Sequence, residues 1–128
     1  MKSPVKSHIG GVFVMVKNMP RAVSWYRELL DLPADDAFTR ETPEDIRTIY
    51  SLSMGKTDLI LDSMHRDELS PSPNHLFYFD TDDIEETFDD LKRKNVTITS
   101  GIEGGNGVRF FGIEDPEGNR LMVCEALR

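Results

Sequence analysis

The side chains of this 128-residue chain that most readily bind a metal ion are its three histidines, His8, His65 and His75. Imidazole combined with carboxylate suits a divalent ion that keeps open positions for substrate oxygens. We expect His8 to be an exposed residue before the first strand and His65 to be a solvated residue of a linker. His75 stands at the start of a predicted strand and needs closer attention as a ligand.

Carboxylates also occur close to predicted strands, at Asp58, Asp62, Asp80 and Glu125. Their positions do not combine with the histidines into a set at matching strand positions. Cys124 is the only cysteine, so the chain has no internal disulfide, and a reducing compartment is favoured. We interpret Cys124 as a small buried hydrophobe rather than a reactive thiol.

A glycine-rich segment, Gly104-Gly105-Asn106-Gly107, precedes one of the predicted strands. It is not a phosphate-binding loop, because such a loop is followed by Lys-Ser or Lys-Thr and then by a helix, and this segment is followed by neither. We interpret it as a flexible loop, with a mobile lid over a cleft as the alternative. Arg109 follows this loop and could pair with an anionic ligand, although the sequence leaves its sheet face open.

The composition excludes several classes of partner. A formal net charge of −8 and a pI near 4.8 argue against binding to a nucleic-acid backbone, which needs clustered Lys and Arg. No segment has the length and apolar character of a membrane span, and no signal-peptide pattern follows the N-terminal lysines. With the unpaired cysteine, these features predict a cytoplasmic protein without nucleic-acid or membrane partners.

The elements that must position these residues follow one order in each half of the chain. The first half predicts a strand over 9–16, a helix capped by Asn18 with Pro20 in its first turn, and apolar helix positions through Leu30. Further strands are predicted over 38–41, 48–54 and 58–63, the last two joined by a turn at Gly55.

The second half repeats this order about 65 residues later. Thr81 or Asp82 is expected to cap its helix, which continues through Leu91. The strands of this half are predicted over 75–80, 96–99, 108–113 and 121–127. The repeat predicts an internally duplicated α+β domain with modules over 7–63 and 74–128 and a proline-bearing linker over 64–73.

Three motifs in this order resemble the vicinal oxygen chelate superfamily, which includes glyoxalases, bleomycin-resistance proteins and extradiol dioxygenases. They are the strand-to-helix segment from Val16 to Leu30, the Asp82-Asp83-Ile84 helix start with Leu91-Lys92, and the turn Asp115-Pro116-Glu117-Gly118-Asn119. The resemblance covers nearly the whole chain. It implies two βαβββ modules forming an open, U-shaped mixed sheet around a cleft, commonly within a homodimer.

The resemblance also implies a divalent metal, held by His and Glu from equivalent strands of both modules. Aligning the motifs puts these positions near Gly11, Ile60, Leu76 and Met122, none of which can coordinate a hard metal ion. This departure argues against glyoxalase and dioxygenase chemistry. His75 precedes Leu76, and strand alternation turns it to the opposite face unless a bulge shifts the register.

The function we predict is therefore small-molecule binding without a metal or another cofactor, and catalysis is left open. A lyase or dioxygenase with an atypical metal set that includes His75 or His8 is one alternative, and a structural or regulatory dimer without a ligand is another. The cleft could form within one chain or between two. The residues expected to line it are Phe13, Met15, Ile60, Leu76, Tyr78, Asp80, Arg109, Arg120, Met122 and Cys124.

Alternation along the strands decides which side chains share the cleft face. We expect Phe13, Met15, Tyr78 and Met122 to lie on the face opposite the helices, with Arg120 or Arg109 as the polar anchor. The residues expected to pack instead beneath the helix residues Tyr26 and Phe88 are Val12, Val14, Phe77, Phe79, Leu121 and Val123. A collapsed core is the alternative interpretation of the lining residues.

Overall fold

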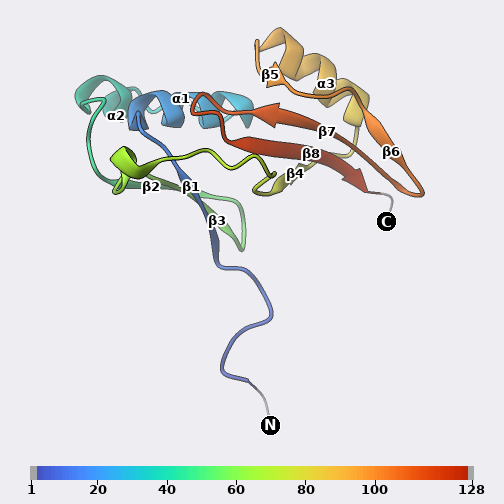
Figure 1. Cartoon of the computed structure of the whole chain (residues 1–128), viewed down its shortest axis with the longest axis horizontal. Helices are drawn as coiled ribbons and strands as arrows, with labels where there is room; N and C mark the ends of the chain where they lie inside the picture. The colour runs from blue at the N-terminus through green and yellow to red at the C-terminus, as the bar shows by residue number, and fades with distance from the viewer. Residues whose placement is uncertain (1–2, 127–128) are drawn as a thin grey trace. The chain divides into compact units, whose positions relative to one another are not determined.

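The computed structural model describes residues 3–126, which form two compact units (Figure 1). The first unit contains the chain up to Val23 together with Asp35–Leu69, and the second contains Ser24–Ala34 together with the chain from Ser70 onward. Each unit has its own mixed sheet and at least part of a helix, so the predicted α+β class is confirmed. Residues 24–34, which the sequence places in the first module, group with the second unit.

The first unit is built on a three-stranded sheet in the order β1-β3-β2. Its strands are β1 (Gly11–Met15), β2 (Ile49–Ser53) and β3 (Asp58–Asp62). β1 runs parallel to β3, and β2 runs antiparallel to it. One face of this sheet carries Val14, Leu52, Leu59 and Leu61, which are at most 3% exposed. The alternation along each strand therefore separates a buried face from an open one.

Helix α1 (Met19–Leu29) begins as the sequence predicts. The Asn18 side-chain oxygen accepts a hydrogen bond from the Arg21 backbone N–H at 3.0 Å, and Pro20 lies in the first turn, where no N–H is needed. The helix ends at Leu29, and Asp31 just beyond it has a φ of 54°, which stops the helical path. Among the described residues, no helix is long and apolar enough to cross a bilayer.

The strand predicted over 38–41 is wrong, because these residues lie in helix α2 (Asp36–Glu41). A local cap explains the difference. The Asp35 carboxylate accepts a hydrogen bond from the Phe38 backbone N–H at 3.2 Å, which starts the helix. The Tyr50 hydroxyl donates to the same carboxylate at 2.7 Å and ties the cap to β2. Only the second contact depends on tertiary structure.

The second unit has a five-stranded sheet in which β4-β8-β7-β5 are neighbours and β6 pairs with β7. Its strands are β4 (Tyr78–Asp80), β5 (Thr97–Ile98), β6 (Glu103–Gly105), β7 (Val108–Glu114) and β8 (Arg120–Ala126). β4 is parallel to β8, and β7 is antiparallel to β8, so the strand pairing of the first unit recurs here. The last strand was predicted to reach Leu127, which lies outside the described residues.

The glycine-rich segment was predicted to be a loop, but part of it forms a strand. Residues 103–105 form β6 and pair antiparallel with β7. Between the two strands, Asn106 and Gly107 have φ values of 52° and 88°. Positive φ at two successive residues is typical of the tight turn that joins twisted antiparallel strands, and an Asn-Gly pair favours it. The sequence prediction missed this hairpin.

Helix α3 (Ile84–Arg93) covers one face of the second sheet (Figure 1). Its N-cap is Asp83, which accepts from the Glu86 backbone N–H at 3.0 Å, and not Thr81 or Asp82 as predicted. Thr81 instead supports the cap, since its hydroxyl accepts a hydrogen bond from the Asp83 N–H at 3.2 Å. The predicted linker contains a short 3₁₀ helix, η1 (Arg66–Glu68).

A buried hydrogen bond joins the second half of α1 to the turn between β7 and β8. The Tyr26 hydroxyl donates to Asp115 Oδ2 at 2.7 Å, and both residues are buried. Asp115 also accepts from the backbone N–H groups of Glu117 and Asn119 and from the Asn119 side-chain amide, each at 2.9 Å. Burial raises the pKa of the Asp115 carboxyl and, more strongly, that of the Tyr26 hydroxyl.

We expect Tyr26→Phe to destabilise the protein by about 1–3 kcal/mol, because a buried carboxylate oxygen loses a donor while the ring stays packed. The free energy of unfolding in urea measures this loss. Tyr50→Phe is the matched control, since its hydroxyl also donates to an aspartate at 2.7 Å but from a less buried position. Equal losses in the two variants would contradict the role assigned to burial.

The raised pKa of Asp115 predicts a pH dependence of stability. A carboxyl whose pKa is higher in the folded state binds its proton more tightly there, so its stabilising effect falls as the pH rises. Compared with Asp115→Asn, the wild type should therefore lose relative stability between about pH 3, below the usual aspartate pKa, and neutrality. Urea unfolding across this range measures the difference. A relative gain would show that the hydrogen bonds outweigh burial and lower this pKa.

Candidate functional site

The open face of the first sheet carries the predicted site residues of that unit. Phe13 is 61% exposed, whereas the next residue, Val14, is fully buried. Phe13 lies opposite Ile60 in the parallel pair, so these two side chains share a face, and Met15 follows on the same face of β1. The direction of the side chains therefore agrees with the alternation expected from the sequence, and ligand binding by them stays a prediction.

Gly11, at the first of the positions implied by the resemblance, has no side chain that could bind a metal ion. A methyl group built on Gly11 would lie 2.9 Å from the Ile60 Cδ1 atom and 3.3 Å from the Asp58 carbonyl oxygen. The Ile60 side chain therefore fills the space that a larger residue at position 11 would use. The two positions expected to supply ligands in this unit form an apolar contact instead.

The second sheet has an equivalent open face. Tyr78 pairs with Met122, and Met122 pairs with Gly112, so these residues form a row across β4, β8 and β7. Tyr78 is 54% exposed and Leu76 is 43% exposed. Leu121, which precedes Met122 on β8 and points to the opposite face, is fully buried. This row corresponds by register to Phe13 and its partners in the first sheet.

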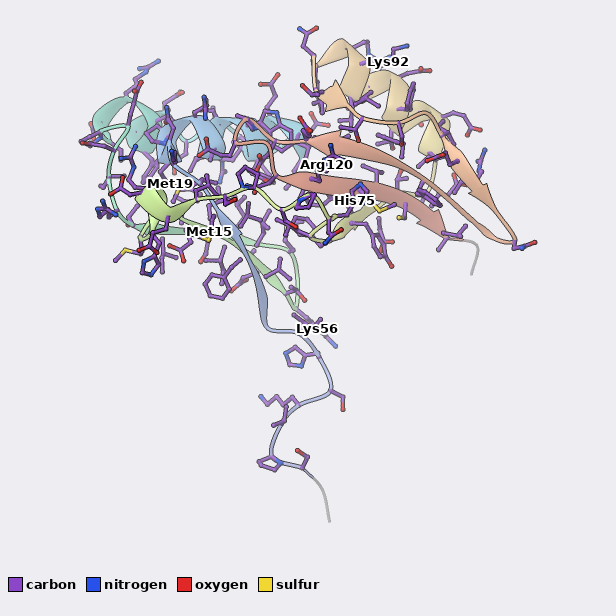
Figure 2. All side chains as sticks on the ribbon, viewed as in Figure 1. Met15, Met19, Lys56, His75, Lys92 and Arg120 are labelled. Atoms are coloured by element: carbon purple, nitrogen blue, oxygen red, sulfur yellow. The ribbon has the colours of Figure 1, made fainter. Side chains whose placement is uncertain are left out.

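His75 lies over this open face and not on the opposite one. β4 begins only at Tyr78, so the strand alternation used in the prediction does not reach His75. Its Nε2 atom lies 3.2 Å from where a Cβ of Gly112 would stand. That same Cβ would overlap the Thr99 hydroxyl, so a larger residue at position 112 would force the Thr99 side chain to move. Figure 2 shows His75 and Arg120 at this sheet.

Sequence analysis did not find this grouping of His75, Thr99 and Gly112. A signal was present, because a glycine inside an otherwise apolar strand indicates close approach of another group. The sequence could not identify that group. The Thr99 contact comes from the segment after β5, and the His75 contact comes from the segment before β4.

The two candidate arginines lie on different faces of the second sheet. Arg120 is on the face of Met122, and its Nε atom is 3.7 Å from Glu114 Oε1. Arg109 is on the opposite face, where it forms ion pairs with Glu125 at 2.8 Å and with Glu85. These hydrogen bonds raise the pKa of Arg109 and lower the pKa values of both glutamates. Arg109 therefore does not share the open face with Tyr78.

Cys124 and Asp80 are neighbours in the β4–β8 pair. Cys124 is 7% exposed, and burial, with a smaller effect from Asp80, raises the pKa of its thiol. A raised pKa keeps the sulfur protonated and weakly nucleophilic. This supports the interpretation of Cys124 as a small buried side chain.

One group of carboxylates within residues 3–126 has the spacing of a metal site, and it lies elsewhere. Asp83, Glu85 and Glu125 each offer an oxygen within 4.8 Å of the others, and no histidine belongs to this group. Arg109 already forms ion pairs with both glutamates, and Asp83 accepts from the N-terminus of α3. With apolar or absent side chains at Gly11, Ile60, Leu76 and Met122, the residues do not fit the metal that the resemblance implies.

A hollow of about 620 Å³ lies beside α3 and the segment that follows it. It is lined by residues including Phe88, Lys92 and Thr97, and the Lys92 ammonium lies 5.4 Å from the centre of the Phe88 ring. None of the residues predicted to line a ligand site borders it. The candidate site is therefore the open sheet face of each unit. The hollow shares with it only the segment of Thr99 and Ser100, which also lies beside Gly112.

Solved structures with the same fold have low sequence identity to this chain. TnmS3, an antibiotic binding protein from Streptomyces sp. CB03234, is 21% identical, with a TM-score of 0.74 over 98% of this chain and 99% of that one. A lactoylglutathione lyase from Agrobacterium tumefaciens is 18% identical, with a TM-score of 0.68 over 96% of each chain. A glyoxalase/dioxygenase from Nostoc punctiforme is 16% identical, with a TM-score of 0.67 over 100% of this chain and 99% of that one.

The search of curated proteins found no match. The model of one protein family, by contrast, matches residues 7–123 and so covers both repeats and the linker. The matching strand order and pairing of the two units agree with this result. The chain belongs to the Glyoxalase/Bleomycin resistance protein/Dioxygenase superfamily.

Proposed function

We propose that this protein binds a small organic molecule without a metal ion. One observation carries the proposal: the positions where the family resemblance places metal ligands hold Gly11, Ile60, Leu76 and Met122. Gly11, Ile60 and Met122 lie on the open sheet faces, and Leu76 is 43% exposed just before β4. Side chains of this kind contact the apolar part of a ligand and cannot bind a hard cation. The superfamily fold is thus combined with an apolar, aromatic binding surface.

The exposed aromatic residues support this reading on physical grounds. Phe13 and Tyr78 are 61% and 54% exposed, although burying such rings is strongly favourable. A flat ligand that covers either ring would gain this free energy, and the Met122 thioether can adapt to its shape. The similarity to the antibiotic binding protein TnmS3 supports the same class of function through the fold alone.

We also propose a homodimer, because β1 and β4 are edge strands of their sheets and each carries an exposed aromatic residue. Edge strands and exposed apolar residues favour pairing with a second chain. A cytoplasmic location belongs to the same proposal and is supported by the single free thiol of Cys124. Light scattering coupled to gel filtration tests the dimer, and a monomer mass at micromolar concentration would exclude it.

A thermal-shift screen of drugs and metabolites tests ligand binding, since a ligand that binds only the folded state raises the melting temperature. We expect at least one apolar ring compound to raise it, and we expect Phe13→Ala or Tyr78→Ala to reduce that rise. The unliganded variants should melt within a few degrees of the wild type, because both side chains are exposed. Met54→Ala, exposed by 39% at the end of β2, is the matched control. A ligand response equal in all three variants would contradict the assigned surface.

Metal analysis of the purified, dialysed protein tests the other half of the proposal. We expect less than stoichiometric Fe, Mn, Ni and Zn, because the donor set at the four positions is apolar. His75→Ala and His8→Ala should leave the metal content unchanged. A stoichiometric metal that is lost in His75→Ala would overturn the proposal and favour a lyase or dioxygenase with an atypical ligand set.

A further inference from the structure

We propose that the open face of the second sheet holds a subsite for a carboxylate group of the ligand, formed by His75, Thr99 and Arg120. This inference rests on the proposed function and adds the chemical class of the ligand, an aromatic carboxylic acid. The three side chains come from separate segments: the one before β4, the one after β5, and the start of β8. His75 and Thr99 meet above a glycine of β7, and Arg120 is a diagonal neighbour of that glycine on the same sheet face.

The glycine is Gly112, and its missing side chain lets two polar side chains approach the sheet at one place. His75 Nε2 lies 3.2 Å from the point where a Cβ of Gly112 would stand, and the Thr99 hydroxyl lies closer still. Both polar atoms therefore lie above the same residue and close to one another. A single oxygen-bearing group there can contact an imidazole N–H and a hydroxyl at the same time.

The His75 ring and the Thr99 hydroxyl can still form hydrogen bonds with a ligand. Over residues 3–126, neither the His75 ring nor the Thr99 hydroxyl forms a hydrogen bond with another residue, and both residues are exposed. The Ser100 hydroxyl, 3.8 Å from the same point, differs because it accepts from the Gly112 N–H. Ser100 therefore fixes the segment against β7, and Thr99 is left to face a ligand.

Arg120 supplies the positive charge. It lies opposite Glu114, and Glu114 is two residues from Gly112 on β7, so Arg120 and Gly112 are diagonal neighbours on one face. Diagonal neighbours are about 7–8 Å apart, within reach of a long side chain. Glu114 approaches the Nε atom at 3.7 Å, too far for a hydrogen bond, so the terminal nitrogens remain for a carboxylate.

The same face selects an aromatic acid over a free inorganic anion. Tyr78 and Met122 continue the row from Gly112, so a ring attached to the carboxylate would lie against an exposed phenol and a thioether. The net charge of −8 repels anions at long range. Binding therefore requires the apolar contact as well as the hydrogen bonds.

Two probes of the same shape test the subsite: 2-naphthoate, which is an anion, and 2-naphthamide, which is neutral. Amide NMR spectra of the whole protein should show 2-naphthoate shifting Thr99, Gly112 and Tyr78. Arg120→Gln should weaken 2-naphthoate binding at least about tenfold, because a charge-assisted hydrogen bond is lost. His75→Gln and Thr99→Val should weaken it less, and Arg120→Lys should retain part of it. The affinity for 2-naphthamide should change less than about twofold in Arg120→Gln.

The controls are His65→Gln, a histidine of the first unit that pairs with Glu68, and Thr97→Val, an exposed threonine of β5. Neither should alter 2-naphthoate binding. The subsite is wrong if 2-naphthoate does not bind at millimolar concentration, or if Arg120→Gln and His75→Gln bind it as the wild type does. If both probes bind with similar affinity and only Tyr78→Ala weakens their binding, the proposed carboxylate subsite is wrong, while the proposal of small-molecule binding stands. If neither probe binds and the thermal screen also finds no ligand, both proposals fail.

Discussion

The second unit depends on the buried hydrogen bond from the Tyr26 hydroxyl to the Asp115 carboxylate. Asp115 is only 5% exposed, so its four hydrogen bonds must largely replace water. Three of them hold the turn between β7 and β8, and the fourth comes from α1. This explains why residues 24–34 group with the second unit although they follow the first strand. This turn aligns β7 with β8, and the alignment determines which of their residues lie on the open face.

The pairing of β7 with β8 and of β4 with β8 sets the chemistry of the open face. A register shift of one residue would exchange the faces and put Leu121 and Val123 in place of Met122. Leu121 and Val123 are at most 3% exposed, so such a shift would expose well-packed core side chains. The same pairing in the first sheet places Phe13 beside Ile60. Burial of one face therefore determines what the other face presents.

Two glycines act in opposite ways on these faces. At Gly11 the absent side chain lets Ile60 move in, so the first sheet becomes apolar where the superfamily resemblance implies a metal ligand. At Gly112 the absent side chain makes room for His75 and Thr99, so the second sheet becomes polar at one place. Glycine permits close approach in both cases, although the chemical results differ. The two units thus share a topology and differ in what their open faces can bind.

The sequence alone determined the repeat, most of the strands, the cap of α1 and the alternation that exposes Phe13 and Tyr78, because these follow from local periodicity and turn chemistry. It also showed that the side chains of Gly11, Ile60, Leu76 and Met122 cannot bind a hard metal ion, since that depends on residue type. Only the tertiary structure decided the positions of Arg109 and His75. Arg109 is held on the helix side by Glu85 and Glu125, and His75 lies before β4 begins. Such contacts join residues far apart in the chain, and no local pattern encodes them.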